Sequence, residues 1–199
     1  MKKLGILLSG RGSNFEAIAQ NVVRGALDAE IGVVISNRPE ARGLAMAREL
    51  GLNAVSIPSK GVDRGNFDAA VARELKSCSV DLVCLAGFMR LLSPTFIREF
   101  PTRILNIHPS LLPAFPGLDA QEQALRHGVK VTGCTVHFVD ELLDAGPIVA
   151  QAAVPVLDED TVESLSARIL AEEHRIYSEA IRRVLSGAWR IEGRRVLRL

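Results

Sequence analysis

Five short apolar runs, separated by amphipathic stretches, dominate the first half of this chain and limit the folds open to it. Each run is short enough and rich enough in Leu, Ile and Val to be a buried strand, and the intervening stretches follow the helical period. Strands that alternate with helices in this way join into a mostly parallel sheet. We predict strands at 4–8, 31–35, 54–57, 82–86 and 104–107, with helices near 14–25, 41–50, 66–77 and 93–99.

The pattern changes after Pro116-Gly117. It predicts a helix at about 119–127, two longer strands near 130–139 and 147–156, a long helix from about 161 to 186, and a hairpin that turns at Glu192-Gly193. No linker, repeat or low-complexity segment interrupts the chain. We therefore predict one α/β domain over residues 1–199, with a mostly parallel half at about 1–100 and a mixed half at about 101–199.

The composition limits the kinds of molecule that this chain is expected to bind. The chain has 199 residues, 48% of them hydrophobic, and a formal net charge of +1, which favours neither nucleic acid nor a membrane surface. No stretch approaches the roughly 20 apolar residues of a membrane span, and no signal peptide is evident. Cys78, Cys84 and Cys134 form no C-x-x-C pair, so a disulfide framework is not expected. We expect a cytoplasmic protein that acts on small molecules, as a monomer or homodimer.

The segment Ser9-Gly10-Arg11-Gly12-Ser13-Asn14 follows the first strand and opens a helix. Its glycines allow the backbone to approach an anion while free helix N–H groups point toward it, an arrangement that suits a phosphate. A plain strand-to-helix turn, with Ser13 or Asn14 as the N-cap, explains the residues equally well. Dinucleotide binding is disfavoured, because a third glycine is missing and the second strand ends in Ser36-Asn37-Arg38 without an acid.

Asn106 and His108 are the strongest candidates for chemistry. In an extended segment their side chains project from the same face, and Pro109 ends the strand directly after them. Asp144 lies in the turn-forming sequence Asp144-Ala145-Gly146-Pro147, which could bring a carboxylate beside the imidazole. An amide, an imidazole and a carboxylate together suit acyl transfer. Taken singly, such a histidine and such an aspartate are more often structural.

The end of the fourth predicted strand leads into Met89-Arg90-Leu91-Leu92, at the edge where open α/β sheets bind ligands. An apolar ledge with one arginine suits a flat aromatic ring that carries an acidic tail. The residues alone favour core packing for the three apolar side chains and a solvated position for Arg90. His127, His137 and His174 are interpreted as structural, and no histidine spacing indicates a metal site.

Three motifs together resemble the folate-dependent formyltransferases. They are Asn-Ile-His-Pro-Ser-Leu-Leu-Pro-x-Phe-Pro-Gly at 106–117, Val-Thr-Gly-Cys-Thr-Val-His-Phe-Val at 131–139, and Asp-Ala-Gly-Pro at 144–147, within a similarity that runs from Leu4 to about Gly187. The resemblance is greatest to members that formylate 5′-phosphoribosylglycinamide. It implies a Rossmann-like formyltransferase fold with a phosphate-binding first half and a catalytic second half. It also implies formyl transfer from 10-formyltetrahydrofolate in purine synthesis, without a metal.

The resemblance assigns roles to individual positions. The implied catalytic residues are Asn106, His108 and Asp144, and the implied contacts to the phosphorylated acceptor are Gly12, Ser13, Asn14 and Glu173. The implied folate contacts are Arg64, Met89, Arg90, Leu91, Leu92, Asn106, Asp140, Glu141 and Asp144. A glutamate on a long helix such as Glu173 is ordinarily solvated. This chain departs from the family pattern at Leu142-Leu143, where relatives often have Gly-Val, and at Asp119 and Gln121, where relatives frequently have histidines.

Other functions remain open on the residues alone. A formyltetrahydrofolate deformylase would use the same three catalytic residues with water as the acceptor, although such relatives usually carry an additional N-terminal module. A methionyl-tRNA formyltransferase would also share them, but it normally has a further C-terminal domain for RNA. In a catalytically silent phosphate-binding module the asparagine, histidine and aspartate would be incidental.

Overall fold

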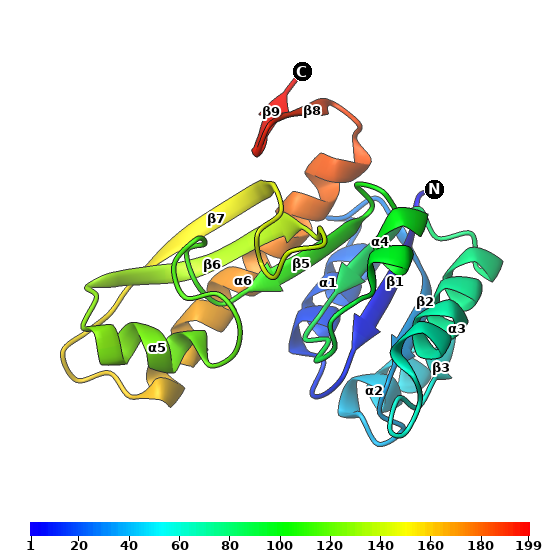
Figure 1. The fold of residues 1–199 in the computed structure, drawn as a ribbon, viewed down its shortest axis with the longest axis horizontal. Helices are drawn as coiled ribbons and strands as arrows, with labels where there is room; N and C mark the ends of the chain where they lie inside the picture. The colour runs from blue at the N-terminus through cyan, green and yellow to red at the C-terminus, as the bar shows by residue number, and fades with distance from the viewer. The chain divides into compact units, whose positions relative to one another are not determined.

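The computed structural model describes residues 1–199, which form two compact units, Met1–Leu105 and Asn106–Leu199 (Figure 1). Unit 1 contains β1 (Lys3–Leu8), α1 (Ser13–Val23), β2 (Glu30–Ser36), α2 (Arg42–Glu49), β3 (Ala54–Ser56), α3 (Arg64–Ser77), β4 (Leu82–Leu85) and α4 (Pro94–Glu99). Unit 2 contains α5 (Ala120–His127), β6 (Val131–Phe138), β7 (Ile148–Pro155), α6 (Val162–Leu185), β8 (Trp189–Glu192) and β9 (Arg195–Arg198). β5 (Ile104–His108) begins in unit 1, and its last three residues belong to unit 2.

Unit 1 is built on parallel strands in the order β3-β2-β1-β4. Leu4, Ile6, Leu7 and Leu8 of the central strand β1 are fully buried, because helices cover both faces of a parallel sheet. α1 contacts α2 and α3 contacts α4, and right-handed crossovers place these two pairs on opposite faces. The predicted α/β class and the predicted elements of this half are confirmed.

Unit 2 has a mixed sheet, as the sequence predicts. β6 and β7 form a long antiparallel ladder from Val131↔Pro155 to His137↔Ile148. β9 pairs with β7 in parallel at Ile148↔Arg195, and β8 and β9 form the predicted terminal hairpin. Backbone pairing at this one position joins the hairpin to β7.

The 24-residue helix α6 provides much of the core of unit 2. It starts with a capping box in which Thr161 and Ser164 satisfy each other's backbone N–H groups. Its apolar residues recur at helical spacing and pack against β6 and β7. The buried side chains of this face are Leu165, Ile169, Ile176, Tyr177, Ala180, Ile181 and Val184, each contributing roughly 1.5–3 kcal/mol where a large apolar group is fully buried.

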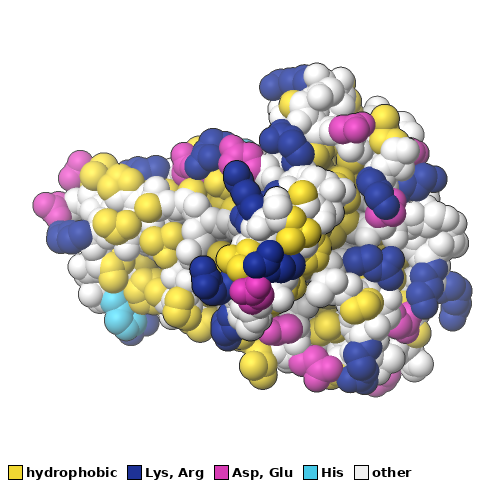
Figure 2. Space-filling model, turned by 90° about the horizontal axis from the view of Figure 1, so that it is seen from above, with side chains coloured by type: hydrophobic (Ala, Val, Ile, Leu, Met, Phe, Trp, Pro, Cys, Tyr) yellow, Lys and Arg dark blue, Asp and Glu magenta, His cyan; other side chains and the backbone are white.

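The surface carries charges of both signs. Figure 2 shows basic and acidic side chains scattered over one face, in keeping with the formal net charge of +1. None of the helices combines the length and the apolar character that crossing a membrane requires.

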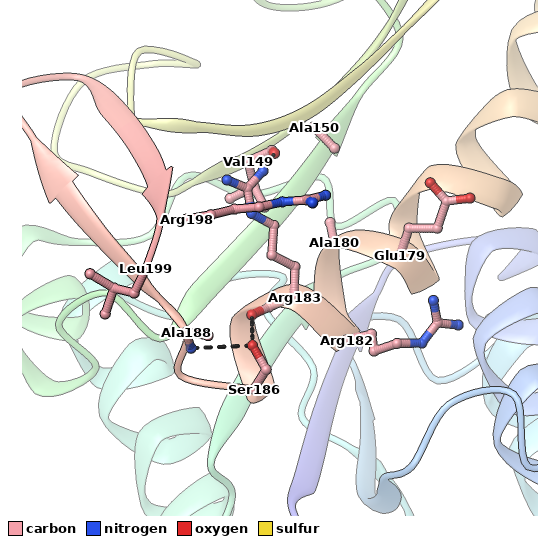
Figure 3. A pocket seen from close by; sticks show the side chains of 10 residues that line it. All are labelled: Val149, Ala150, Glu179, Ala180, Arg182, Arg183, Ser186, Ala188, Arg198 and Leu199. Atoms are coloured by element: carbon pink, nitrogen blue, oxygen red, sulfur yellow. Dashed lines mark hydrogen bonds between the residues drawn. The ribbon is translucent and has the colours of Figure 1, made fainter.

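Arg183, near the end of α6, is among the residues that line a cavity in unit 2 (Figure 3). Its guanidinium donates to the carbonyl oxygen of Val149 at 2.8 Å and to that of Val196 at 3.0 Å, joining β7 to β9 where the strand ladder is short. The cavity has a volume of about 540 Å³ and is lined also by Glu179, Arg182 and Arg198. The cavity contains none of the side chains that the sequence singles out for function, and the two hydrogen bonds to strand carbonyls give Arg183 a structural role.

Candidate functional site

The polar cluster of unit 2 is positioned first by β5. This strand ends at His108, directly before Pro109, as the sequence predicts. The apolar side chains of Leu105 and Ile107 are buried, while Asn106 and His108 occupy the alternate positions of the strand. His108 is itself 5% exposed. A buried imidazole requires hydrogen-bond partners, and the structure provides them.

Both ring nitrogens of His108 face oxygen atoms. Nε2 donates to the carbonyl oxygen of Phe115 at 2.8 Å, and Nδ1 lies 3.4 Å from Oδ2 of Asp144. Because a carbonyl oxygen and a carboxylate oxygen can only accept, Nε2 donates to Phe115, and a hydrogen on Nδ1 would point toward Asp144. The Nδ1 contact is longer than an ordinary hydrogen bond, so Nδ1 is the nitrogen that remains able to contact a ligand.

Asp144 is held in the required place by a constrained turn. Its φ of 48° lies in the left-handed region, which aspartate tolerates better than most residues. Its Oδ2 accepts the backbone N–H of Gly117 at 2.8 Å. A Cβ on Gly146 would lie 1.8 Å from the carbonyl oxygen of Phe138, so only glycine fits there. The turn thus brings the carboxylate beside the imidazole, with 10% of the Asp144 side chain exposed.

His137, which the sequence analysis treats as structural, belongs to the same cluster. Its Nδ1 donates to the carbonyl oxygen of Phe138 at 2.9 Å, so its Nε2 accepts from Nδ2 of Asn106 at 3.2 Å. Nε2 also lies 3.7 Å from Oδ1 of Asp144. Burial lowers the pKa of His137 despite the nearby carboxylates, which favours the neutral ring. The only sequence signal was its place at the end of a strand that enters the loop of Asp144.

The contact with His137 fixes the orientation of the Asn106 side chain. Since Nε2 of His137 takes one hydrogen of the amide, Nδ2 of Asn106 faces the ring. The other amide hydrogen stays available to a ligand. Asn106 is half-buried, so a small group can reach it. The cluster as a whole can offer hydrogen-bond donors to an oxygen that develops negative charge.

In unit 1, the loop between β1 and α1 has the form that the phosphate interpretation needs. Gly12 is buried with a φ of 79°, and a Cβ there would lie 2.7 Å from Cα of Gly43. Gly12 is also the N-cap of α1 and no side chain caps the helix, so the expectation of Ser13 or Asn14 as N-cap is wrong. Gly10 has open space where a side chain would project. The first N–H groups of a helix lack carbonyl partners within it and can bind an anion.

The segment 87–92 presents an apolar ledge. Met89 is 61% exposed and Leu91 is 62% exposed, so core packing is wrong for these two side chains and correct for the buried Leu92. Arg90 is not fully solvated, because its guanidinium lies 4.7 Å from the centre of the Phe67 ring. Large exposed apolar side chains in a constrained loop are typical of a ligand surface.

The end of the ledge is fixed by α3. Arg64 donates to the carbonyl oxygen of Leu92, and Asp68, which is buried, accepts the backbone N–H of Ser93 at 2.6 Å. Arg64 therefore contacts the ledge that carries the other predicted folate contacts of unit 1. These bonds hold the backbone of the ledge while leaving Met89 and Leu91 exposed.

The remaining predicted residues lie in unit 2. Glu173 on α6 is 7% exposed, so the solvated position expected for it is wrong. Burial and the charges of Glu173 and Glu172 raise the pKa of the Cys134 thiol to about 12. Asp140 accepts the N–H of Leu142 at 3.0 Å, and Glu141 is exposed in the same loop. Both lie within four residues of Asp144.

Comparison with known proteins agrees with the motifs. The family described as formyl transferase matches residues 2–181, so the chain belongs to the formyl transferase family and the resemblance predicted from the sequence is confirmed. It is 41% identical to a phosphoribosylglycinamide formyltransferase of Bacillus subtilis, over 93% of this chain and 95% of that protein. A crystal structure of glycinamide ribonucleotide transformylase 1 from Symbiobacterium toebii has a TM-score of 0.98 and 56% identity, covering 100% of this chain and 94% of that one.

Other relatives are longer than this chain. It is 46% identical, over 94% of its length, to the trifunctional purine biosynthetic protein adenosine-3 of Drosophila melanogaster, but it spans 14% of that protein. A structure of a formyltetrahydrofolate deformylase from Pseudomonas syringae pv. tomato has a TM-score of 0.93 and 29% identity, covering 100% of this chain and 66% of that one. The fold is therefore common to proteins with two different names.

Proposed function

We propose that the protein transfers the formyl group of 10-formyltetrahydrofolate to the amine of 5′-phosphoribosylglycinamide, a reaction of purine synthesis. The observation that carries this proposal is the buried cluster of Asn106, His108 and Asp144, in which an amide and an imidazole are fixed by a carboxylate and a second histidine. The higher identity to proteins named for this reaction than to the deformylase supports the choice of acceptor.

Asn106 and His108 stabilise the charge that develops on the formyl oxygen. When the neutral amine attacks the formyl carbon, the carbonyl oxygen becomes an oxyanion that needs preorganised donors. The second amide hydrogen of Asn106 supplies one donor, and Nδ1 of His108, whose contact with Asp144 is long at 3.4 Å, supplies the other. The hydrogen bond from Nε2 to Phe115 keeps the ring in the correct plane.

Asp144 accepts and donates the protons that move during the reaction. As the new carbon–nitrogen bond forms, the amine must lose a proton, and the folate nitrogen must gain one when its bond to the formyl carbon breaks. Asp144 accepts the first proton and returns it, directly or through an ordered water. The products are the formylated glycinamide and tetrahydrofolate, so atoms and charge balance without a further reactant.

Unit 1 supplies binding groups for both substrates. The acceptor's phosphate binds the backbone of Gly12, Ser13 and Asn14 at the start of α1, with Glu173 of unit 2 as a further acceptor contact. Folate contacts are assigned to Arg64, the ledge Met89-Arg90-Leu91-Leu92 and the loop Asp140–Asp144, together with Asn106. All substrates in this proposal are small molecules.

The experiment that tests this function follows the formyl group. Purified protein is given 10-formyltetrahydrofolate with and without 5′-phosphoribosylglycinamide, and both tetrahydrofolate and the formylated product are quantified. We expect one formylated acceptor for each tetrahydrofolate, and release at least roughly a hundredfold slower without the acceptor, because water lacks the phosphate that binds the loop. Release of tetrahydrofolate at the full rate without the acceptor would show that the protein is a deformylase and would overturn the proposal.

A further inference from the structure

Three buried polar side chains connect the ends of β1 and β2 to the loop after β3. Ser9, Asn37 and Ser59 are 2%, 7% and 9% exposed. Ser9 donates from Oγ to Oδ1 of Asn37 at 2.5 Å, and Nδ2 of Asn37 donates to Oγ of Ser59 at 3.1 Å. Asn37 is therefore the middle of a continuous chain of hydrogen bonds at the ligand-binding edge of unit 1.

The same chain reaches the ledge. The backbone N–H of Met89 donates to Oγ of Ser9 at 2.8 Å, and the N–H of Ser9 donates to the carbonyl oxygen of Gly87 at 3.0 Å. Ser9 also begins the phosphate loop, because Gly10 and Gly12 follow it. One serine thus joins the loop that approaches a phosphate to the segment that presents Met89 and Leu91.

Asn37 determines the orientation of the Ser9 hydroxyl. A hydroxyl has one hydrogen, and Ser9 gives it to Asn37, so its oxygen is left to accept from Met89. Without the carbonyl of Asn37, the Ser9 hydroxyl loses the acceptor that fixes its side-chain rotamer, so its oxygen is no longer held toward the N–H of Met89. The carboxyl ends of parallel strands often carry an acid at this position for a ribose, whereas here an amide takes part in an internal network.

We infer that Asn37 is a positioning residue that couples the phosphate loop to the ledge, so that the two substrates of the proposed reaction depend on one buried amide. This inference rests on the proposed function for its substrates but on unit 1 alone for its geometry. Asn37 has no assigned contact with either substrate and takes no part in proton transfer. Its loss should therefore weaken binding of both substrates together and leave the chemical step unchanged.

The test compares Asn37→Ala with Ser56→Ala. Ser56 ends β3 on the same edge, and its buried hydroxyl has no hydrogen-bond partner, which makes it a matched control. We expect Asn37→Ala to raise the KM for both 10-formyltetrahydrofolate and 5′-phosphoribosylglycinamide about fivefold, the effect of losing one net hydrogen bond, with kcat within about twofold. Ser56→Ala should change neither KM. A change in only one KM, or equal changes in the control, would overturn the coupling.

Amide hydrogen exchange measured by NMR separates this inference from the proposed function, because it needs no substrate. Exchange of the Met89 amide should rise about tenfold in Asn37→Ala, as its hydrogen-bond acceptor is released. Asn37→Asp should restore protection, since a carboxylate still accepts from the Ser9 hydroxyl. Unchanged Met89 exchange in Asn37→Ala would refute the coupling even in an active enzyme. A wild type that transfers no formyl group would refute the function and leave the exchange result intact.

Discussion

The two units carry candidate groups of different chemical kinds. At the edge of unit 1 the candidate groups are backbone amides, the side chains of Arg64 and Arg90, neutral serine and asparagine side chains, and exposed apolar residues such as Met89 and Leu91. In unit 2 the candidate groups are ionisable and enclosed: His108 and His137 are 5% and 2% exposed, and both lie close to Asp144.

From this difference we expect substrate binding to depend mainly on unit 1 and the chemical step mainly on the cluster of unit 2. Backbone donors, arginine side chains and exposed apolar surface provide affinity without taking part in proton transfer. Enclosed ionisable groups act strongly on a developing charge because little water competes with them. Changes in unit 1 should therefore act on KM, and changes in the cluster of unit 2 should act on kcat.

The largest effect is expected from Asp144→Asn. Asparagine tolerates the left-handed backbone at this position and can still accept the Gly117 N–H, so the turn should persist. Loss of the charge and of the proton acceptor should lower kcat by roughly 10²–10³, the typical cost of removing a preorganised catalytic group. Steady-state kinetics gives kcat, and thermal unfolding checks the fold.

Asp158→Asn is the matched control for this variant. Asp158 is a surface acid of the same unit, paired with Lys130 at 2.6 Å, and its replacement should leave kcat unchanged. A kcat within about threefold of wild type in Asp144→Asn would remove the carboxylate from the mechanism.

A smaller effect, on affinity alone, is expected from Gly10→Asp. A side chain at Gly10 meets open space, whereas one at Gly12 would collide with Gly43, so only Gly10 allows a charge to be added without distortion. The new carboxylate should repel the acceptor's phosphate and raise its KM about tenfold or more. The KM for 10-formyltetrahydrofolate should stay within about twofold. Gly10→Asn, equal in bulk but uncharged, should behave as wild type, and an equal rise in that variant would mean that bulk is responsible.

The smallest effect concerns stability and pH. Burial holds the pKa of His137 below its ordinary value of 6.5, although Asp144 and Asp140 oppose the shift. As the pH falls, the unfolded chain therefore binds a proton at His137 before the folded protein does. The contribution of neutral His137 to the stability of the fold is complete above pH 6.5 and is lost as the pH falls toward the pKa of His137 in the folded protein. Urea unfolding from pH 7.5 to 5 should show a steeper loss for wild type than for His137→Gln. Parallel curves would show that His137 is not the group responsible.

Much of this organisation could be predicted from the sequence, because local signals decide it. The period of the apolar residues gave the strands and helices to within a few residues, and Pro109 marked the end of β5. Alternation along an extended segment put Asn106 and His108 on one face. The turn residues around Asp144 indicated that its carboxylate could lie beside the end of this strand. In the structure, Oδ2 of Asp144 lies 3.4 Å from Nδ1 of His108.

The remaining features depend on contacts between distant segments. His137 joins the cluster only because β6 lies where its Nε2 can meet Asn106, 31 residues away in the sequence. Met89 and Leu91 are apolar residues of the kind that usually pack in a core. They are exposed because the backbone of the ledge is fixed by hydrogen bonds to segments far away in the sequence. Glu173 is buried by the packing of α6, which helical periodicity does not predict for a charged residue.

A single-turnover measurement tests the division between binding and chemistry most directly. Enzyme in excess over labelled 10-formyltetrahydrofolate is mixed with increasing 5′-phosphoribosylglycinamide, and the rate of formyl transfer is followed for Gly10→Asp and Asp144→Asn. At saturating acceptor, Gly10→Asp should transfer the formyl group at the wild-type rate, while Asp144→Asn should stay roughly a hundredfold slower at every concentration. A slow rate for saturated Gly10→Asp, or recovery of Asp144→Asn with more acceptor, would contradict the account.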